Sequence, residues 1–244
     1  MKREYWIIII AYVGMHLSSL IAYPLFMLIG SFTDIPAKEL QVKSGAYWIV
    51  ISFFITISIV LLLLRREMKE TIDKRNGVPI SSAVLWAIGG VFLAFFSQYA
   101  AGAIELALGI KPGSENTQQI VSLIEQVPLV MVVTSIVGPI LEEIIFRKII
   151  FGELYKRFNF FISALLSSII FGIAHFELVH IILYSAMGFT FAFLYVKTKR
   201  ILVPIFAHVT MNTVVVLIQL TFKDDIEKMM NDMEKVQSFI GGFI

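Results

Sequence analysis

A small set of ionisable and amide side chains lies inside long apolar runs of this sequence, where a membrane would make each charge cost about 2.5–3.5 kcal/mol or more. The set comprises Glu142, Glu143, Arg147, His175, His208 and Asn212. A lone histidine in a membrane helix more often hydrogen-bonds a neighbouring helix than performs chemistry, and one Glu–Arg pair is usually structural. Several costly placements in one chain are harder to explain in this way, so we take them as a candidate site.

The spacing of these residues separates the roles of the two adjacent glutamates. In an α-helix, residues four apart share a face, and adjacent residues are about 100° apart. Glu143 and Arg147 are four apart and can form an ion pair, whereas Glu142 lies about 140° around the helix from Arg147. We therefore predict that Arg147 holds Glu143, while Glu142 is free to face water and substrate. His208 and Asn212 are also four apart, so both can face one cavity.

Gly138 and Pro139 come just before the two glutamates. Proline suits the first turn of a helix, and the free backbone N–H groups of that turn favour nearby negative charge. A helix that restarts at Pro139 would therefore lower the cost of burying the two carboxylates.

Glutamate, histidine and asparagine together are suited to the hydrolysis of an amide by water. A carboxylate in an apolar cavity has a raised proton affinity, which suits a general base. A histidine can share the proton transfer or bind a metal. A second histidine with an asparagine can donate hydrogen bonds to a developing oxyanion, where one donor contributes about 10²–10³ in rate.

Other ways of cutting peptide bonds in a membrane lack the residues that they need. The sequence has no cysteine, no Gly-x-Ser-Gly motif for a serine nucleophile and no His-Glu-x-x-His zinc motif. No aspartate lies within an apolar run, so an aspartyl dyad is absent. The segment from His175 to His180, His-Phe-Glu-Leu-Val-His, comes close to a zinc motif. Its histidines are five apart, however, and would point about 140° apart on a helix.

Three motifs, taken in order, resemble those of the CPBP family, the CAAX proteases and bacteriocin-processing enzymes that are also called the Abi family. They are Glu-Glu-x-x-x-Arg at 142–147, Phe-x-x-x-His at 171–175 and His-x-x-x-Asn at 208–212. Each motif alone is weak evidence, but every position is filled, in order, on apolar runs. The resemblance covers about residues 120–222, which we take as the catalytic core, and the first three spans add nothing to it.

The resemblance implies an all-helical, glutamate-dependent intramembrane endopeptidase of the CAAX-protease type. Carried over to this sequence, Glu142 would activate water together with His175. His208 and Asn212 would form the oxyanion site, and the adjacent Glu–Arg pair would support them. The family has been called a metalloprotease family, yet the glutamate-dependent mechanism requires no metal. Two histidines and a glutamate can also ligate zinc, so a metal held by Glu142, His175 and His208 stays open.

The implied partners are the lipid bilayer and a membrane-associated protein or peptide substrate. A prenylated CaaX protein, a secreted peptide precursor and another membrane protein would all fit. Two other functions stay open: a non-proteolytic scaffold with an immunity or regulatory role, and a transporter with a proton relay. The complete motif set favours the enzyme over the scaffold, and the lack of internal repeats disfavours the transporter. The formal net charge of +2 is too small to indicate nucleic-acid binding.

The elements that carry these residues are predicted to be transmembrane helices. Of the 244 residues, 58% are hydrophobic and 16% are charged, against about 45–50% apolar and about 25% charged residues in soluble domains. A helix needs about 20 apolar residues to cross a bilayer. The apolar runs predict spans at 5–30, 46–64, 82–108, 120–157, 160–176, 178–196 and 201–222.

The run at 120–157 is too long for one straight span. It is either one long kinked helix or two pieces broken at Gly138 and Pro139. We therefore predict an all-α polytopic bundle of seven transmembrane helices, or eight if this run is divided, that forms a single membrane domain over residues 1–244.

Lysines and arginines orient the bundle. Alternate ends of the predicted spans carry 14 of the 20 basic residues, or 13 if Arg147 is discounted as buried, and the other ends carry six. Basic residues favour the cytoplasmic side of a membrane. We therefore predict a multi-pass protein of the cell membrane with a cytoplasmic N-terminus.

Three further polar residues are interpreted as structural. Glu105 and Glu125 lie near the ends of their apolar runs, where an interfacial position costs least. His16 lies alone within the first run, and we expect it to hydrogen-bond a neighbouring helix.

Overall fold

The computed structural model describes residues 1–244 except 34, 74–76, 227, 230–231 and 233–244, and the described part is helical without β-strands. The basic residues Lys74, Arg75 and Lys235 lie outside the described residues. The helices are α1 (Arg3–Gly30), α2 (Ala37–Asp73), α3 (Ile80–Ala107), α4 (Glu115–Gln126), α5 (Leu129–Val132), the π-helical η1 (Val133–Val137), α6 (Gly138–Glu142), the π-helical η2 (Glu143–Phe151), α7 (Gly152–Leu154), α8 (Phe160–Ile173), the 3₁₀ turn η3 (Leu178–His180), α9 (Ile181–Thr198) and α10 (Leu202–Thr221).

The predicted all-α membrane bundle is confirmed, with a difference in the number of full-length spans. Among the described residues, six helices are long and apolar enough to cross a membrane: α1, α2, α3, the continuous segment α5–α7, α9 with η3, and α10. The predicted fifth span is shorter than expected, because α8 has 14 residues. At 1.5 Å per residue it is about 21 Å long, less than a hydrocarbon core of about 30 Å. The polar helix α4 adds no further span.

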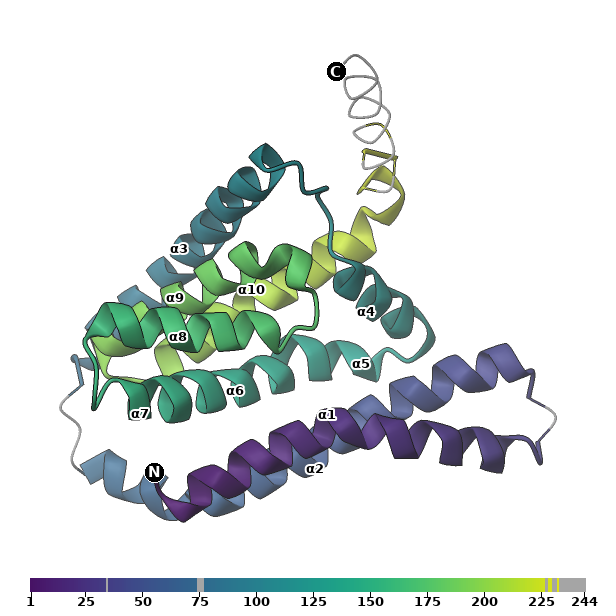
Figure 1. The fold of residues 1–244 in the computed structure, drawn as a ribbon, viewed down its shortest axis with the longest axis horizontal. Coiled ribbons are helices and arrows are strands. Elements are labelled where there is room, and N and C mark those ends of the chain that lie inside the picture. Colours follow the sequence, from purple (N-terminus) through teal and green to yellow (C-terminus); the bar gives the residue numbers. More distant parts are fainter. Residues whose placement is uncertain (34, 74–76, 227, 230–231, 233–244) are drawn as a thin grey trace.

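The helices surround the segment α5–α7 (Figure 1). The α1–α2 hairpin runs along one side of this segment, and α8, α9 and α10 pack on the other, with α3 against α9 and α10. Because it contacts helices on both sides, α5–α7 is the most buried of the six candidate spans. It also carries both glutamates and the arginine of the candidate site, so these ionisable groups are kept away from lipid.

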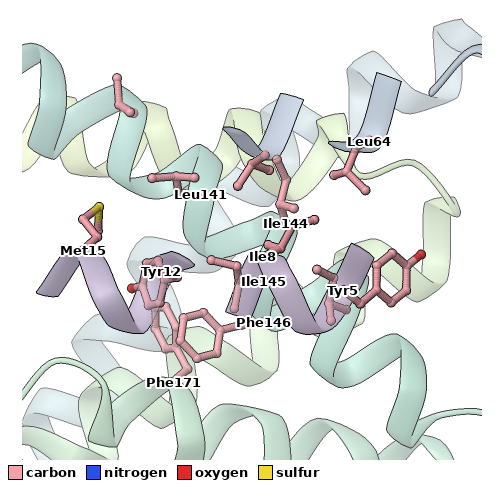
Figure 2. Packing of buried hydrophobic residues seen from close by; sticks show 13 residues of the cluster. Tyr5, Ile8, Tyr12, Met15, Leu64, Leu141, Ile144, Ile145, Phe146 and Phe171 are labelled. Atoms are coloured by element: carbon pink, nitrogen blue, oxygen red, sulfur yellow. The ribbon is translucent and has the colours of Figure 1, made fainter. Parts of the chain in front are cut away.

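Apolar side chains fix α1 against the α6–η2 segment (Figure 2). The cluster includes Tyr5, Ile8, Tyr12 and Met15 of α1, Leu141, Ile144, Ile145 and Phe146 of the central segment, and Phe171 of α8. On the outer face of α1, Leu20 and Ile21 are exposed. Such exposure is expected in a bilayer, where the hydrophobic effect does not drive helices together and close packing decides which faces meet. This packing places α1 beside the helix that carries Glu142.

The basic ends of the helices meet at one end of the molecule, as their alternation along the chain predicts. Glu67, near the end of α2, binds Lys2 at 3.1 Å and Lys148 of η2 at 2.9 Å. Arg200, between α9 and α10, donates from Nε to the carbonyl oxygen of Val78, which precedes α3. These contacts join the start of α1, the α2–α3 connection, the end of the central helix and the α9–α10 turn. Which membrane face they occupy stays a prediction.

Of the two alternatives for the run at 120–157, a break at Gly138 and Pro139 is not observed. The backbone is helical from Leu129 to Leu154, and the π-helical η1 immediately precedes α6. A π turn has hydrogen bonds to the fifth residue back, which lets a helix accommodate proline without a break. The break lies instead before α5, where Val127 adopts an extended conformation (φ −136°, ψ 88°). Pro128 explains this conformation, because a residue that precedes proline is driven out of the helical region.

Candidate active site

A cavity of about 770 Å³ lies among α1, α3, α4, α6, α8, α9 and α10. All four residues that the sequence predicts to be catalytic line it: Glu142, His175, His208 and Asn212. They come from α6, from the turn after α8 and from α10, three separate parts of the chain. The structure therefore gathers these side chains around one space, while their roles in catalysis stay a prediction.

The predicted ion pair between Glu143 and Arg147 is confirmed. Arg147 Nε is 3.2 Å from Glu143 Oε2, and both side chains are fully buried. The contact is an ion pair without good hydrogen-bond alignment. The guanidinium carbon also lies 4.5 Å from the ring centroid of Phe171 and 5.6 Å from that of Phe191. A cation enclosed by a carboxylate and two aromatic faces has electrostatic partners on several sides.

His208 lies between the two glutamates. Its Nδ1 is 2.9 Å from Glu143 Oε1, and its Nε2 is 3.7 Å from Glu142 Oε2. Because a carboxylate only accepts hydrogen bonds, Nδ1 carries a proton and donates to Glu143. Nε2 then accepts a hydrogen bond in the neutral ring and donates one in the imidazolium. The ring is held by stacking on Phe191 at a centroid distance of 4.5 Å.

The two adjacent glutamates occupy different environments. Glu143 is fully buried between Arg147 and His208, whereas the Glu142 side chain is 18% exposed and faces the cavity. The prediction that Glu143 is paired while Glu142 faces the cavity agrees with this geometry. The α-helical spacing of 3.6 residues per turn, on which that prediction relied, does not hold here. The residues from Glu143 onward are π-helical, with backbone hydrogen bonds to the fifth residue. Packing against α10, which supplies His208, therefore decides which glutamate faces the cavity.

His175 lies in a turn rather than inside a span. α8 ends at Ile173, although the apolar run continues to residue 176. His175 Nδ1 is 2.8 Å from the carbonyl oxygen of Phe171 and donates to it, which leaves Nε2 unprotonated in the neutral ring. The ring also stacks on Tyr184, with centroids 4.1 Å apart. His175 thus presents the ring form that can take a proton from water.

Comparisons with known proteins agree with these motifs. The sequence profile of the Rce1-like type II CAAX prenyl endopeptidases matches residues 124–214. The "Putative membrane peptidase YdiL" of Bacillus subtilis (strain 168) is 51% identical over 247 residues, which cover 99% of each chain. The "Membrane-embedded CAAX protease MroQ" of Staphylococcus aureus (strain USA300) is 30% identical over 198 residues, 78% of this chain and 80% of the relative. The chain belongs to the Rce1-like CAAX protease family. No solved structure matches it.

The side chains of the Rce1-like site do not form a group suited to a metal ion. Among the residues that the structure describes, no three His, Asp or Glu side chains form a group that could hold a metal ion. Glu142, His175 and His208, the ligands considered from the sequence, line one cavity without forming such a group. Nδ1 of His208 is already bonded to Glu143. The metalloprotease alternative therefore finds no support in the geometry.

The segment from His175 to His180 is not a zinc motif, as expected. His175 lies in the turn after α8, and His180 belongs to η3. His180 Nδ1 is 2.7 Å from Glu105 Oε2. Glu105 was expected at the membrane interface; it lies near the end of α3, and its side chain is 2% exposed because protein covers it. A residue near the end of an apolar run can still be covered by a neighbouring turn, which sequence position alone does not reveal.

His16 is a cavity residue of the Rce1-like site that sequence reasoning missed. It lines the cavity, and its ring contacts Tyr12 at 4.7 Å and Phe176 at 6.3 Å between centroids. We expected His16 to hydrogen-bond a neighbouring helix. Its Nε2 makes no such bond, because this atom is buried and has no partner among the described residues. A lone polar residue in a span is a weak signal, because its direction depends on how α1 is rotated in the bundle.

Proposed function

We propose that this chain is a glutamate-dependent intramembrane endopeptidase that hydrolyses peptide bonds of a membrane-associated protein or peptide precursor. Membership of the CAAX protease family supports the reaction class. The observation that carries the proposal is the cavity in which Glu142 faces His208 and shares the lining with His175 and Asn212. Water is absent from the bilayer core, so a polar cavity among the helices is the first requirement for hydrolysis.

In the proposed mechanism, Glu142 takes a proton from a water molecule, with His175 Nε2 sharing the transfer. The water oxygen forms a bond to the carbonyl carbon of the substrate, and the carbonyl oxygen becomes an oxyanion. Nε2–H of the His208 imidazolium and the side-chain amide of Asn212 donate hydrogen bonds to this oxyanion. The carbon–nitrogen bond then breaks, and the proton taken from water passes to the leaving nitrogen.

The carboxylates around His208 support its part in this mechanism. An oxyanion donor at Nε2 requires the imidazolium, since Nδ1 already donates to Glu143. The carboxylates of Glu143 and Glu142 lie at opposite nitrogens of the ring, 2.9 Å from Nδ1 and 3.7 Å from Nε2. Arg147 is in turn paired with Glu143. The chain of contacts from Arg147 through Glu143 to His208 therefore fixes the orientation of the His208 ring, with Nε2 on the side of Glu142.

The proposal is tested by comparing peptides in membranes from cells that express the wild type, Glu142→Gln or Glu125→Gln. Glu125 is a matched control, because its carboxylate is 43% exposed and binds Lys223 outside the cavity. We expect peptides with new termini in wild-type and control membranes, and a loss of about 10²-fold or more in Glu142→Gln, as for removal of a general base. The same peptides at equal abundance in all three samples would overturn the proposed peptidase activity and leave the scaffold and the transporter as the remaining functions.

The substrate class is part of the proposal. The family is described as type II CAAX prenyl endopeptidases, and the two relatives are described as a putative membrane peptidase and a membrane-embedded CAAX protease. We infer from these descriptions that the substrate is a membrane-associated polypeptide. The termini of the released peptides would identify the cleavage site and whether a lipid-modified cysteine precedes it.

A further inference from the structure

The turn that carries His175 is not stabilised by helix geometry alone. α8 ends at Ile173, two residues before His175, and the next residue, Phe176, has a φ of 57°. This left-handed conformation is unfavourable for a bulky residue and persists only where the surrounding structure determines it. Neighbouring contacts must therefore hold the turn, and with it the direction of the His175 ring.

The first group of contacts reaches His175 through Tyr184. The two rings are stacked, with centroids 4.1 Å apart and planes 25° apart. The Tyr184 hydroxyl donates to Glu177 Oε2 at 2.7 Å, and the Ser114 hydroxyl donates to the same oxygen at 2.7 Å. The other oxygen of Glu177 accepts the backbone N–H of Glu115 at 2.7 Å. Glu177 therefore joins the turn, the first residues of α9 and the start of α4.

The charge of Glu177 suits this position. Burial raises the pKa of Glu177, but hydrogen bonds from Ser114, Tyr184 and the Glu115 N–H outweigh it and lower the pKa below its ordinary value. The carboxylate thus stays ionised at neutral pH and remains an acceptor for all three donors.

The second group of contacts fastens the other end of the turn. His180 Nδ1 is 2.7 Å from Glu105 Oε2, and His180 Nε2 is 2.8 Å from the carbonyl oxygen of Gly113. The other oxygen of Glu105 accepts the backbone N–H of Leu183 at 2.9 Å. The segment between α8 and α9 is therefore tied to Ser114 and the start of α4 at Glu177, and to α3 and the α3–α4 loop at His180. Such a double attachment leaves the turn little freedom to relax.

We propose that Glu177 and Tyr184 are positioning residues that hold the His175 ring for proton transfer. This inference rests on the proposed function for the role of His175, whereas the contacts themselves are independent of that function. Stacking on Tyr184 restricts rotation of the imidazole, and the bond to Glu177 restricts Tyr184. Glu177 is fixed in turn by α4. The segment from His175 to His180 therefore contributes three side chains to the cavity lining, those of His175, Phe176 and His180. The contacts of Glu177 and His180 anchor the turn.

Three variants separate stacking from hydrogen bonding. Tyr184→Phe keeps the ring and removes the bond to Glu177, Glu177→Gln weakens the same bond from its other end, and Tyr184→Leu removes the stacked ring. We expect Tyr184→Phe and Glu177→Gln each to slow release of the Glu142-dependent peptides about three- to tenfold, as for the loss of one hydrogen bond. The double variant is expected to be no slower than the slower single variant, because both changes remove one contact. Tyr184→Leu is expected to be slowest.

A second measurement reports on the His175 ring without any substrate. The chain has only four histidines, so ring signals of histidine-labelled protein in detergent can be assigned with single His→Gln variants. We expect His175 to carry its proton on Nδ1 and to have ring signals shifted upfield by the Tyr184 ring. The upfield shift should vanish in Tyr184→Leu, persist in Tyr184→Phe and be unaffected in the Glu125→Gln control.

Each outcome decides between the two proposals. An unchanged His175 signal in folded Tyr184→Leu, or peptide release as fast as wild type in all three variants, would overturn the positioning inference. Altered His175 signals together with identical peptides in wild-type and Glu142→Gln membranes would instead defeat the proposed function. Tyr184→Phe keeps the test decisive if Tyr184→Leu fails to fold, because it changes a single hydroxyl group.

Discussion

At the residue scale, two neighbouring glutamates differ in environment. Glu143 has an arginine and a histidine as partners and no exposure, whereas Glu142 faces the cavity and is partly exposed. A buried charge needs a partner, because removing one member of a buried pair costs about 3–5 kcal/mol. The site thus combines a fixed carboxylate with one that can exchange protons, and substitution can separate the two.

Substitutions of Glu142, Glu143 and Arg147 are expected to separate effects on stability from effects on activity. Glu142→Gln should leave melting temperature in detergent near wild type and abolish cleavage, because the Glu142 carboxylate is partly exposed to the cavity and Glu143 remains as the carboxylate beside Arg147 and His208. Arg147→Ala should destabilise the protein by about 3–5 kcal/mol, since it leaves Glu143 buried beside only His208. Glu143→Gln should also lower stability, because it leaves the buried guanidinium without its carboxylate.

The double variant Glu143→Gln with Arg147→Met is the control for this prediction. It should recover part of the lost melting temperature, because no buried ion is left without a counterion. Normal cleavage by Glu142→Gln combined with a stable but inactive Glu143→Gln would mean that the two glutamates have the opposite roles.

At the element scale, irregular segments position the reactive groups. The π-helical η2 begins at Glu143, and the turn after α8 carries His175. π-Helical segments within α-helices are often found at functional sites. Both segments are held by long-range contacts: η2 by packing against α8 and α9, and the turn by Glu177 and His180. The geometry of the site therefore depends on tertiary contacts more than on helix propensity.

The contribution of Glu177 to stability is expected to depend on pH. Its pKa is lower in the folded protein than the ordinary value of 4.5, because hydrogen bonds outweigh the effect of burial. A lowered folded pKa stabilises the protein above the ordinary pKa, and this stabilisation is lost as pH falls through the folded pKa. Melting temperatures of wild type and Glu177→Gln should therefore differ at pH 7 and converge in acid below 4.5. A difference that is the same at both pH values would contradict the assigned hydrogen bonds.

At the scale of the whole molecule, the chain passes repeatedly between a basic end and an opposite end. Glu67 and Arg200 link the basic segments at one end, and Lys223 binds Glu125 near the other. α8 is the exception among the passes, since it is shorter than a membrane span. Because α8 is short, the turn that follows it brings His175 to the cavity that Glu142 of α6 and His208 of α10 also line.

Topology reporters test the predicted orientation. A reporter fused after Arg200, at the basic end, should indicate the cytoplasm, because Lys and Arg are retained on that side. A reporter fused after Gly113, in the α3–α4 connection, should indicate the opposite side. The reverse pattern at both positions would invert the protein in the membrane, and the same side at both would contradict the path of the chain.

The sequence by itself determined the class of structure, the identity of the candidate residues and the Glu143–Arg147 pair. These follow from local information: long apolar runs require a bilayer, costly charges within them mark a site, and residues four apart meet on a helix. Three weak motifs in order also sufficed to indicate the family, which the comparisons confirmed.

Only the tertiary structure decided how the residues meet. The π-helical winding after Glu142 and the burial of Glu105 depend on neighbours distant in sequence, whereas the helix break before Pro128 follows from the local effect of proline on Val127. His16 lines the cavity because α1 packs against Phe146 and Phe171. Glu177 has its hydrogen-bond partners because the start of α4 lies beside the turn. Periodicity fixes which residues share a face of one helix, but tilt, rotation and contact between helices arise from packing of the whole bundle.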